Sequence, residues 1–140
     1  MARTPHPLPS AAALRVGLDV VDVARLGRSV ERGGRRFRDR IFTPKEWAYA
    51  SSRVDRDDAL AARIAAKEAV MKALGTGWGK GVAWTDVEVE GGGRTEPRLR
   101  LHGKAAKIAK ARGLSIAISL SHAGGIAAAV AIATRDTSKA

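Results

Sequence analysis

The spacing of hydrophobic and polar positions near the start of the chain predicts a strand followed by a helix. Residues 14–20 are mostly apolar and partly β-branched, which is typical of a buried strand, and Asp19 stands near its end. From residue 22 the apolar positions recur at helical spacing, with arginines on another face. Gly33 and Gly34 are expected to close this amphipathic helix.

Capping signals and composition predict two further helices. Thr43 offers an N-cap hydroxyl, and a proline and Glu46 follow it in the order of a capping box, so a short helix should run to about Ser51. Residues 57–74 are rich in Ala, Leu, Met, Lys and Glu and form the strongest helical segment. Gly75 is suited to a left-handed C-terminal cap and should end this long helix.

The second half of the chain alternates between strand and helix signals. Residues 84–90 and 98–101 alternate like strands around a run of three glycines, which predicts a hairpin, and residues 104–112 are expected to form a helix. Residues 115–121 and 126–133 should pair as a last hairpin. This order predicts an α+β fold in which an antiparallel sheet packs against one long helix.

One domain is expected, over residues 14–134. Chains of about 100–200 residues usually form one domain, and hydrophobic residues, at 45%, can supply its core. Residues 1–13 are expected to be a flexible arm, and residues 135–140 a frayed end. Residues 113–134 carry no charged side chain, but their polar, turn-forming middle predicts two strands and not a membrane helix.

The charge and cysteine content exclude several classes of protein. The chain has 140 residues and a net charge of +11, so it is not an acidic solvating protein. It has no cysteine, which excludes a disulfide framework, a thiolate nucleophile and a cysteine-based zinc site. Its start lacks the apolar run of a signal peptide, so a cytoplasmic location is expected.

Four residues are candidates for chemistry. Asp19 ends an apolar strand, where a carboxylate either caps the next helix or holds a cation. Glu68 and Lys72 are four residues apart and share a helix face, as a simple salt bridge or as part of a site. His122 stands in a turn between apolar strands, where a lone histidine is more often structural than catalytic.

The glycine-rich segment 75–81 is not a P-loop. Gly81 stands where a P-loop has Ser or Thr, and the segment follows a helix. Its backbone N–H groups suit phosphate oxygens, and a plain connector is the alternative. Three histidines and no cysteine disfavour zinc, whereas Asp and Glu oxygens suit a hard cation such as Mg²⁺.

Four stretches of the chain together match the pattern of one known family. They are Gly17-Leu18-Asp19-Val20 followed by Arg25, then residues 42–46, residues 62–77 and residues 119–122. The Lys-Glu-Ala core at residues 67–69, with Gly-Thr-Gly downstream, is the most specific part. The chain resembles the holo-acyl-carrier-protein synthases, the small single-lobed 4′-phosphopantetheinyl transferases, over residues 14–134, and a fold of that kind is expected.

This resemblance implies a reaction and its residues. The phosphopantetheine arm of coenzyme A would be transferred to a serine of an apo acyl carrier protein, leaving adenosine 3′,5′-bisphosphate. Asp19 and Glu68 match the residues that hold Mg²⁺, Lys72 matches a catalytic cation, and Glu68 is also a candidate for taking the serine proton. The residues that match contacts to coenzyme A are Arg63, Gly75, Thr76, Gly77 and His122.

The resemblance also implies an assembly and a protein partner. Single-lobed members build their site between subunits and are usually homotrimers. Acyl carrier proteins are acidic, and the basic helix offers them a complementary surface made of Arg25, Arg28, Arg32, Arg35 and Arg36.

Two alternatives and two details stay open at this point. The same arginines suit nucleic-acid phosphate, although aromatic residues are only 4% and no stacking platform is visible. A catalytically silent assembly protein is the other alternative, against which the matched acids argue. Ala123 stands where some members have an acid, and Lys67 would reach either the 3′-phosphate of coenzyme A or a neighbouring surface.

Overall fold

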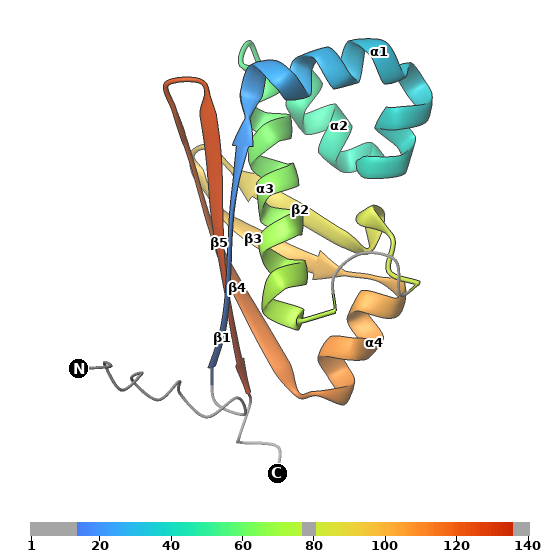
Figure 1. Cartoon of the computed structure of the whole chain (residues 1–140), viewed down its shortest axis with the longest axis vertical. Helices are drawn as coiled ribbons and strands as arrows, with labels where there is room; N and C mark the ends of the chain where they lie inside the picture. The colour runs from blue at the N-terminus through green and yellow to red at the C-terminus, as the bar shows by residue number, and fades with distance from the viewer. Residues whose placement is uncertain (1–13, 77–80, 136–140) are drawn as a thin grey trace, which may run out of the picture.

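The computed structural model describes residues 14–76 and 81–135 (Figure 1). Its helices are α1 (Val23–Ile41), α2 (Pro44–Ser51), α3 (Arg56–Leu74) and α4 (Gly103–Ala111), with a short 3₁₀ turn, η1 (Trp84–Asp86). Its strands are β1 (Leu14–Asp22), β2 (Val87–Gly92), β3 (Thr95–Leu101), β4 (Leu114–Ala123) and β5 (Ile126–Arg135). The predicted N-terminal arm, Gly77 and residues 136–140 lie outside the described residues.

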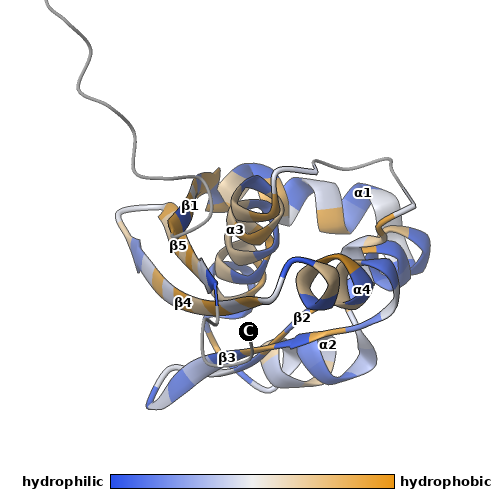
Figure 2. Ribbon diagram, turned by 90° about the horizontal axis from the view of Figure 1, so that it is seen from below, coloured by the Kyte–Doolittle hydropathy of each residue, from blue (hydrophilic) through white to orange (hydrophobic). Residues whose placement is uncertain are grey.

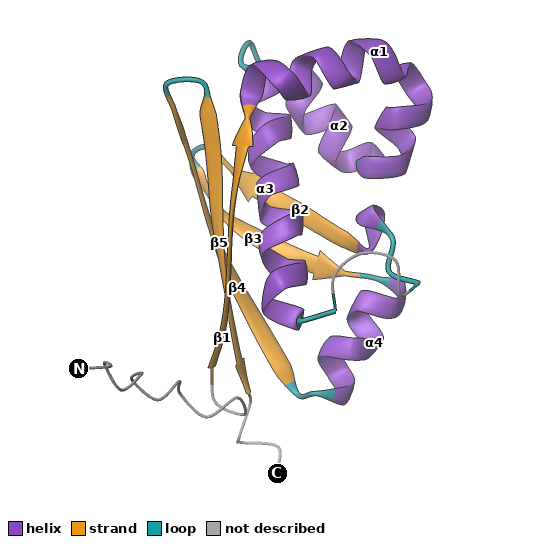
Figure 3. Cartoon of the chain, in the orientation of Figure 1, coloured by secondary structure: helices purple, strands orange, loops and turns teal. Residues whose placement is uncertain are grey.

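Antiparallel strands curve around α3. β1, β5 and β4 form a three-stranded sheet in that spatial order, and β2 pairs with β3 in a separate sheet. The view in Figure 2 has β4 and β3 side by side below α3, and Figure 3 shows the helices on one side of the three-stranded sheet. The predicted α+β class and antiparallel pairing are confirmed. The strands form two sheets, however, and α1 spans 19 residues, as α3 does.

Small residues let the strands approach α3 closely. Alternate alanines of β5, at positions 127, 129, 131 and 133, are buried on the sheet face that α3 covers. On β1, a Cβ atom added to Gly17 would lie 1.8 Å from the carbonyl oxygen of Ala69, so a glycine is required there. α3 itself is rich in alanine and is buried on most of its surface, which makes it the centre of the core.

Several element boundaries differ from the sequence prediction, and three of these differences change the interpretation. Gly34 interrupts α1 as expected, with φ 55°, but the chain becomes helical again and α1 ends at Ile41, which is buried. Residues 84–86 form a 3₁₀ turn instead of a strand, because the Asp86 side chain accepts a hydrogen bond from the N–H of Ala83 at 3.1 Å. Arg135 belongs to β5 and is not part of a frayed end.

The charge-free stretch at residues 113–134 forms strands. β4 and β5 account for almost all of it and pair in an antiparallel hairpin, as the polar turn in its middle predicts. In the described part of the chain, no helix has the length and hydropathy needed to cross a membrane.

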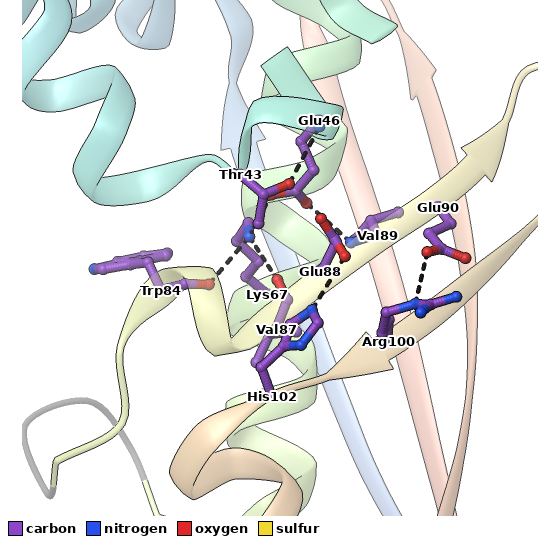
Figure 4. A network of polar contacts seen from close by, with 10 residues as sticks. All are labelled: Thr43, Glu46, Lys67, Trp84, Val87, Glu88, Val89, Glu90, Arg100 and His102. Atoms are coloured by element: carbon purple, nitrogen blue, oxygen red, sulfur yellow. Dashed lines mark hydrogen bonds and ion pairs between the residues drawn. The ribbon is translucent and has the colours of Figure 1, made fainter. Parts of the chain in front are cut away.

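A buried lysine joins α3 to the segment that leads into β2 (Figure 4). The Lys67 side chain is fully buried, and its Nζ donates to Glu46 Oε1 at 2.8 Å, to the Trp84 carbonyl at 3.0 Å and to the Val87 carbonyl. Burial lowers the pKa of Lys67, and the Glu46 carboxylate opposes that shift. Lys67 therefore faces the protein interior, where it contacts neighbouring elements of the chain, and it does not reach toward the 3′-phosphate of coenzyme A.

Glu46 connects α2 to both α3 and β2. Its Oε1 accepts the N–H of Thr43 at 3.0 Å, completing the predicted capping box, and its Oε2 accepts the N–H of Val89 at 2.9 Å. Next to it, Glu88 lies 3.1 Å from His102 Nε2. Burial acts to raise the pKa of Glu88, but hydrogen bonds from Thr43 and His102 outweigh it and hold that pKa below its usual value.

We expect the substitution Lys67→Met to lower the free energy of unfolding by about 3–5 kcal/mol, because it leaves the Glu46 carboxylate buried without its counterion. Urea denaturation at neutral pH measures this loss. Lys107→Met on α4 removes the same charge from an exposed position and should change stability by less than about 0.5 kcal/mol. Equal losses in the two variants would contradict the role given to the buried pair.

Candidate active site

Asp19 lies on the face of β1 that is turned toward α3. Lys72 reaches across from α3, with its Nζ 2.9 Å from the Leu18 carbonyl and 3.3 Å from Asp19 Oδ1. The Asp19 side chain is 20% exposed and that of Lys72 is 54% exposed. This ion pair therefore lies at an edge of α3 that solvent can reach.

β1 runs antiparallel to α3. Arg15, near the start of β1, donates from Nε to the Ala73 carbonyl at 2.6 Å, close to the end of α3. Gly17 is packed against Ala69 and Ala73. Two further residues of a strand advance by about 6.6 Å, which equals the rise of four to five helical residues. Asp19 therefore lies about one turn nearer to the start of α3 than Gly17 does.

Glu68 is on the turn of α3 that this register places beside Asp19. It is half-buried and stands four residues before Lys72, so the two side chains share one face of the helix. Two carboxylates and one ammonium group, from β1 and α3, thus gather on one flank of α3. Within the described residues no group of three or more His, Cys, Asp or Glu side chains is placed to hold a metal ion.

Arg63 and His122 meet in a pocket of about 250 Å³ on another side of α3. His122, at the end of β4, has its Nδ1 3.5 Å from Asp58 Oδ1 and its Nε2 3.9 Å from Asp55 Oδ2. The residues that line the pocket are Tyr49, Arg53, Asp55, Ala59, Ala62, Arg63, Gly93, Leu120, Ser121 and His122.

Arg63 is unusual because an arginine is here almost completely buried, with the whole residue only 2% exposed. Its Nη2 donates to the Gly91 carbonyl at 2.8 Å, and its Cζ lies 4.0 Å from the centre of the Tyr49 ring. Burial lowers the pKa of Arg63 from its usual value. In the described part of the chain its Nε has no hydrogen-bond partner, although an N–H donor at this depth normally has one. The pocket therefore holds a cation with an unused donor.

The two groups of residues lie on different flanks of α3. Arg63 and Glu68 are five residues apart, which is about 140° around a helix. Asp19 is on β1 and His122 on β4, with β5 between these two strands. One protomer thus brings Asp19 and Lys72 together and Arg63 and His122 together, but it does not join the two pairs.

The remaining predicted site residues lie directly after the end of α3 and on α1. Gly75 ends α3 in the left-handed conformation, with φ 73°, as predicted, and Thr76 follows it. The five arginines of the predicted docking surface all lie on α1 and are exposed: Arg25, Arg28, Arg32, Arg35 and Arg36.

Three polar residues of the pocket, Tyr49, Arg53 and Asp55, were missed by the sequence analysis. Arg53 donates to the Tyr49 hydroxyl at 3.2 Å and pairs with Asp55 at 2.8 Å. The available signal was the spacing of four residues between Tyr49 and Arg53 near the end of a predicted helix. That signal is weak, because Tyr49 becomes part of a pocket only through its contact with Arg63 from α3.

Comparisons with known proteins agree with this architecture. Residues 15–131 match the family described as the 4′-phosphopantetheinyl transferase superfamily. The holo-[acyl-carrier-protein] synthase of Solibacter usitatus is 48% identical over 107 residues, which are 76% of this chain and 86% of that protein. The corresponding protein of Moorella thermoacetica is 48% identical over 122 residues, which are 85% of this chain and 92% of that protein.

A solved structure extends the likeness to three dimensions. The Helicobacter pylori holo-[acyl-carrier-protein] synthase in complex with coenzyme A matches with a TM-score of 0.74 at 29% identity, covering 85% of this chain and 99% of that one. The fold, the sequence motifs and these matches define the class: this chain belongs to the 4′-phosphopantetheinyl transferase superfamily. Within it, the chain is an enzyme of the holo-[acyl-carrier-protein] synthase group, which confirms the resemblance noted from the motifs.

Proposed function

We propose that this protein transfers 4′-phosphopantetheine from coenzyme A to a serine of an apo acyl carrier protein, releasing adenosine 3′,5′-bisphosphate. The observation that carries the proposal is the placement of Asp19 and Lys72 in contact, with Glu68 one turn away on the same flank of α3. The relatives' names and the coenzyme A in the Helicobacter pylori structure support it.

Mg²⁺ is the metal ion that fits this flank. Mg²⁺ prefers oxygen ligands and is commonly held by one or two carboxylates together with substrate phosphates. Asp19 and Glu68 would be the protein ligands, and the Asp19 carboxylate lies at an edge of α3 that solvent can reach. When bound, the ion neutralises phosphate charge and polarises the phosphorus that is attacked.

Lys72 and Glu68 have separate tasks in this proposal. The Lys72 ammonium group turns from Asp19 to the diphosphate and stabilises the charge that develops on the leaving bisphosphate. Glu68 accepts the serine proton. The serine oxygen then forms a bond to the phosphorus of phosphopantetheine, while the bond to the bridging oxygen breaks and its electron pair leaves with adenosine 3′,5′-bisphosphate.

Arg63 and His122 would bind other phosphate oxygens of coenzyme A, with backbone contacts from Gly75, Thr76 and Gly77. The unused Nε of the buried Arg63 supports this assignment, since a buried donor gains from an anionic partner. Because this pocket and the Asp19 flank lie on different sides of α3, a complete site requires a second subunit.

An uncovered sheet face supports assembly into a homotrimer. On the side facing away from α3, the three-stranded sheet exposes large apolar side chains at 41% to 59% of their surface. Patches of this kind commonly mark protein interfaces. Packing copies of this face together would bring the Asp19 flank of one subunit toward the His122 pocket of the next. The exposed residues are Leu14, Val16, Leu18, Val20, Ile126 and Ile132.

The exposed arginines of α1 would guide the acidic carrier protein to the site, since complementary charge raises the rate of encounter. The cytoplasm is the compartment we propose, because a chain without cysteine fits a reducing environment.

Intact-mass spectrometry of an apo acyl carrier protein tests the reaction directly. With this protein, coenzyme A and Mg²⁺, the carrier should gain the mass of one phosphopantetheine group. Asp19→Asn and Glu68→Gln should each lower the rate about a hundredfold or more, because each removes a metal ligand. Glu96→Gln, at an exposed position on β3, serves as the control and should keep full activity. No mass gain with several carriers would refute the proposal and favour the nucleic-acid alternative.

Reversing charge on α1 tests the docking surface. We expect Arg28→Glu with Arg32→Glu to raise the KM for the carrier about tenfold or more while the KM for coenzyme A changes little, because these exposed charges meet the protein partner. Lys107→Glu with Lys110→Glu makes the same charge change on α4. If both double variants act alike, or if both KM values rise together, α1 is not the docking site.

The oligomeric state tests the sheet face. Light scattering during gel filtration should give a trimer for the natural protein and a monomer for Val16→Lys, since Val16 is 57% exposed on this face. The monomer should also lose transfer activity. Val54→Lys changes an exposed residue outside the face and should leave the trimer intact. A fully active monomeric natural protein would rule out a site shared between subunits.

A further inference from the structure

The C-terminal end of α3 has all of its terminal carbonyl groups occupied by hydrogen-bond donors. A helix leaves its last four carbonyls without partners inside the helix. Two of them, those of Met71 and Lys72, accept the N–H of Gly75 at 3.0 Å and 3.1 Å. This is the contribution expected from a glycine that ends a helix.

The other two carbonyls are occupied by arginine side chains from distant parts of the chain. Arg15 of β1 donates from Nε to the Ala73 carbonyl at 2.6 Å. Arg112, directly after α4, donates from Nη1 to the Leu74 carbonyl. Neither arginine has an acidic partner within the described residues. Two positive charges therefore converge on the end of α3 without a carboxylate to neutralise them.

This arrangement matters because a helix C-terminus repels anions. The aligned peptide dipoles place about half a negative charge at that end, which opposes phosphate binding in the segment that follows. Gly75 and Thr76 form the start of that segment. The guanidinium groups of Arg15 and Arg112 carry two full positive charges, so they reverse the sign of the charge near these two residues.

The start of the segment also offers a polar group that is not used. The Oγ1 atom of Thr76 is buried and has no hydrogen-bond partner in the part of the chain that is described. A Cβ atom on Gly75 would lie 2.2 Å from Arg15 Nη2, so the guanidinium group packs directly against the Gly75 backbone. An unused hydroxyl and a guanidinium group thus lie next to each other at the end of α3.

We infer that Arg15 and Arg112 are positioning residues for anion binding: they cap the end of α3 and make Gly75 and Thr76 a binding site for a phosphate group of coenzyme A. This inference rests on the proposed function, because it assigns a phosphate of that substrate. It adds two residues that the sequence motifs do not contain.

Charge-removing substitutions test the inference. Arg15→Gln and Arg112→Gln keep an N–H donor for the carbonyl but remove the charge, so the cap can persist while the electrostatic effect is lost. Isothermal titration calorimetry of the assembled protein with coenzyme A, at several salt concentrations, is the measurement. Each variant should weaken binding about five- to tenfold and reduce the dependence of Kd on salt. Arg15→Lys should restore most of the affinity, and Lys107→Gln is the control with the same loss of charge.

The outcomes separate three cases. Unchanged affinity and salt dependence in both Gln variants would overturn the inference while leaving the proposed function intact. A fall in melting temperature with an unchanged Kd for coenzyme A would show a structural cap only, and would overturn it as well. If the natural protein fails to bind coenzyme A, the proposed function itself fails. Because Arg112 is exposed, its variant remains informative even if Arg15→Gln does not fold.

Discussion

The buried ion pair between Lys67 and Glu46 sets the position of the elements around it. An ammonium group inside a protein is tolerated only when its hydrogen-bond donors have acceptors, and Lys67 finds them in Glu46 and in the carbonyls of Trp84 and Val87. These contacts hold α2, α3 and the entry to β2 in one arrangement. Because Lys67 must point inward, the next residue, Glu68, is turned about 100° around the helix, to a half-buried position beside β1.

α3 thereby contributes side chains to two different surfaces of the protein. The flank beside β1 carries acids and a lysine, whereas the side toward β4 carries a buried arginine and a histidine. Close packing against Gly17 and the alanines of β5 keeps these surfaces at fixed positions, since larger side chains would push the strands away from the helix. This division of charge between two flanks is the physical reason for our proposal that one subunit contributes two half-sites.

Much of the local structure could be predicted because its signals lie within a few residues. The capping box of Thr43 and Glu46 and the end of α3 at Gly75 were both predicted, and both are present. The second role of Glu46 could not be predicted, because its partner Lys67 lies 21 residues away and nothing near either residue marks the contact. Gly34 was recognised as an interruption, but the helix resumes because Ile41 and Phe42 bury their side chains beyond it.

The sequence by itself determined the class of fold, most helix and strand positions and, through its motifs, the family. Periodicity, capping and motif spacing are local properties, so they can be read without coordinates. The tertiary structure decided that the strands form two sheets, that Lys67 is buried while Glu68 is not, and that Arg15 and Arg112 meet at the end of α3. Each of these depends on partners far away in the chain, whose contacts exist only once the whole chain has packed.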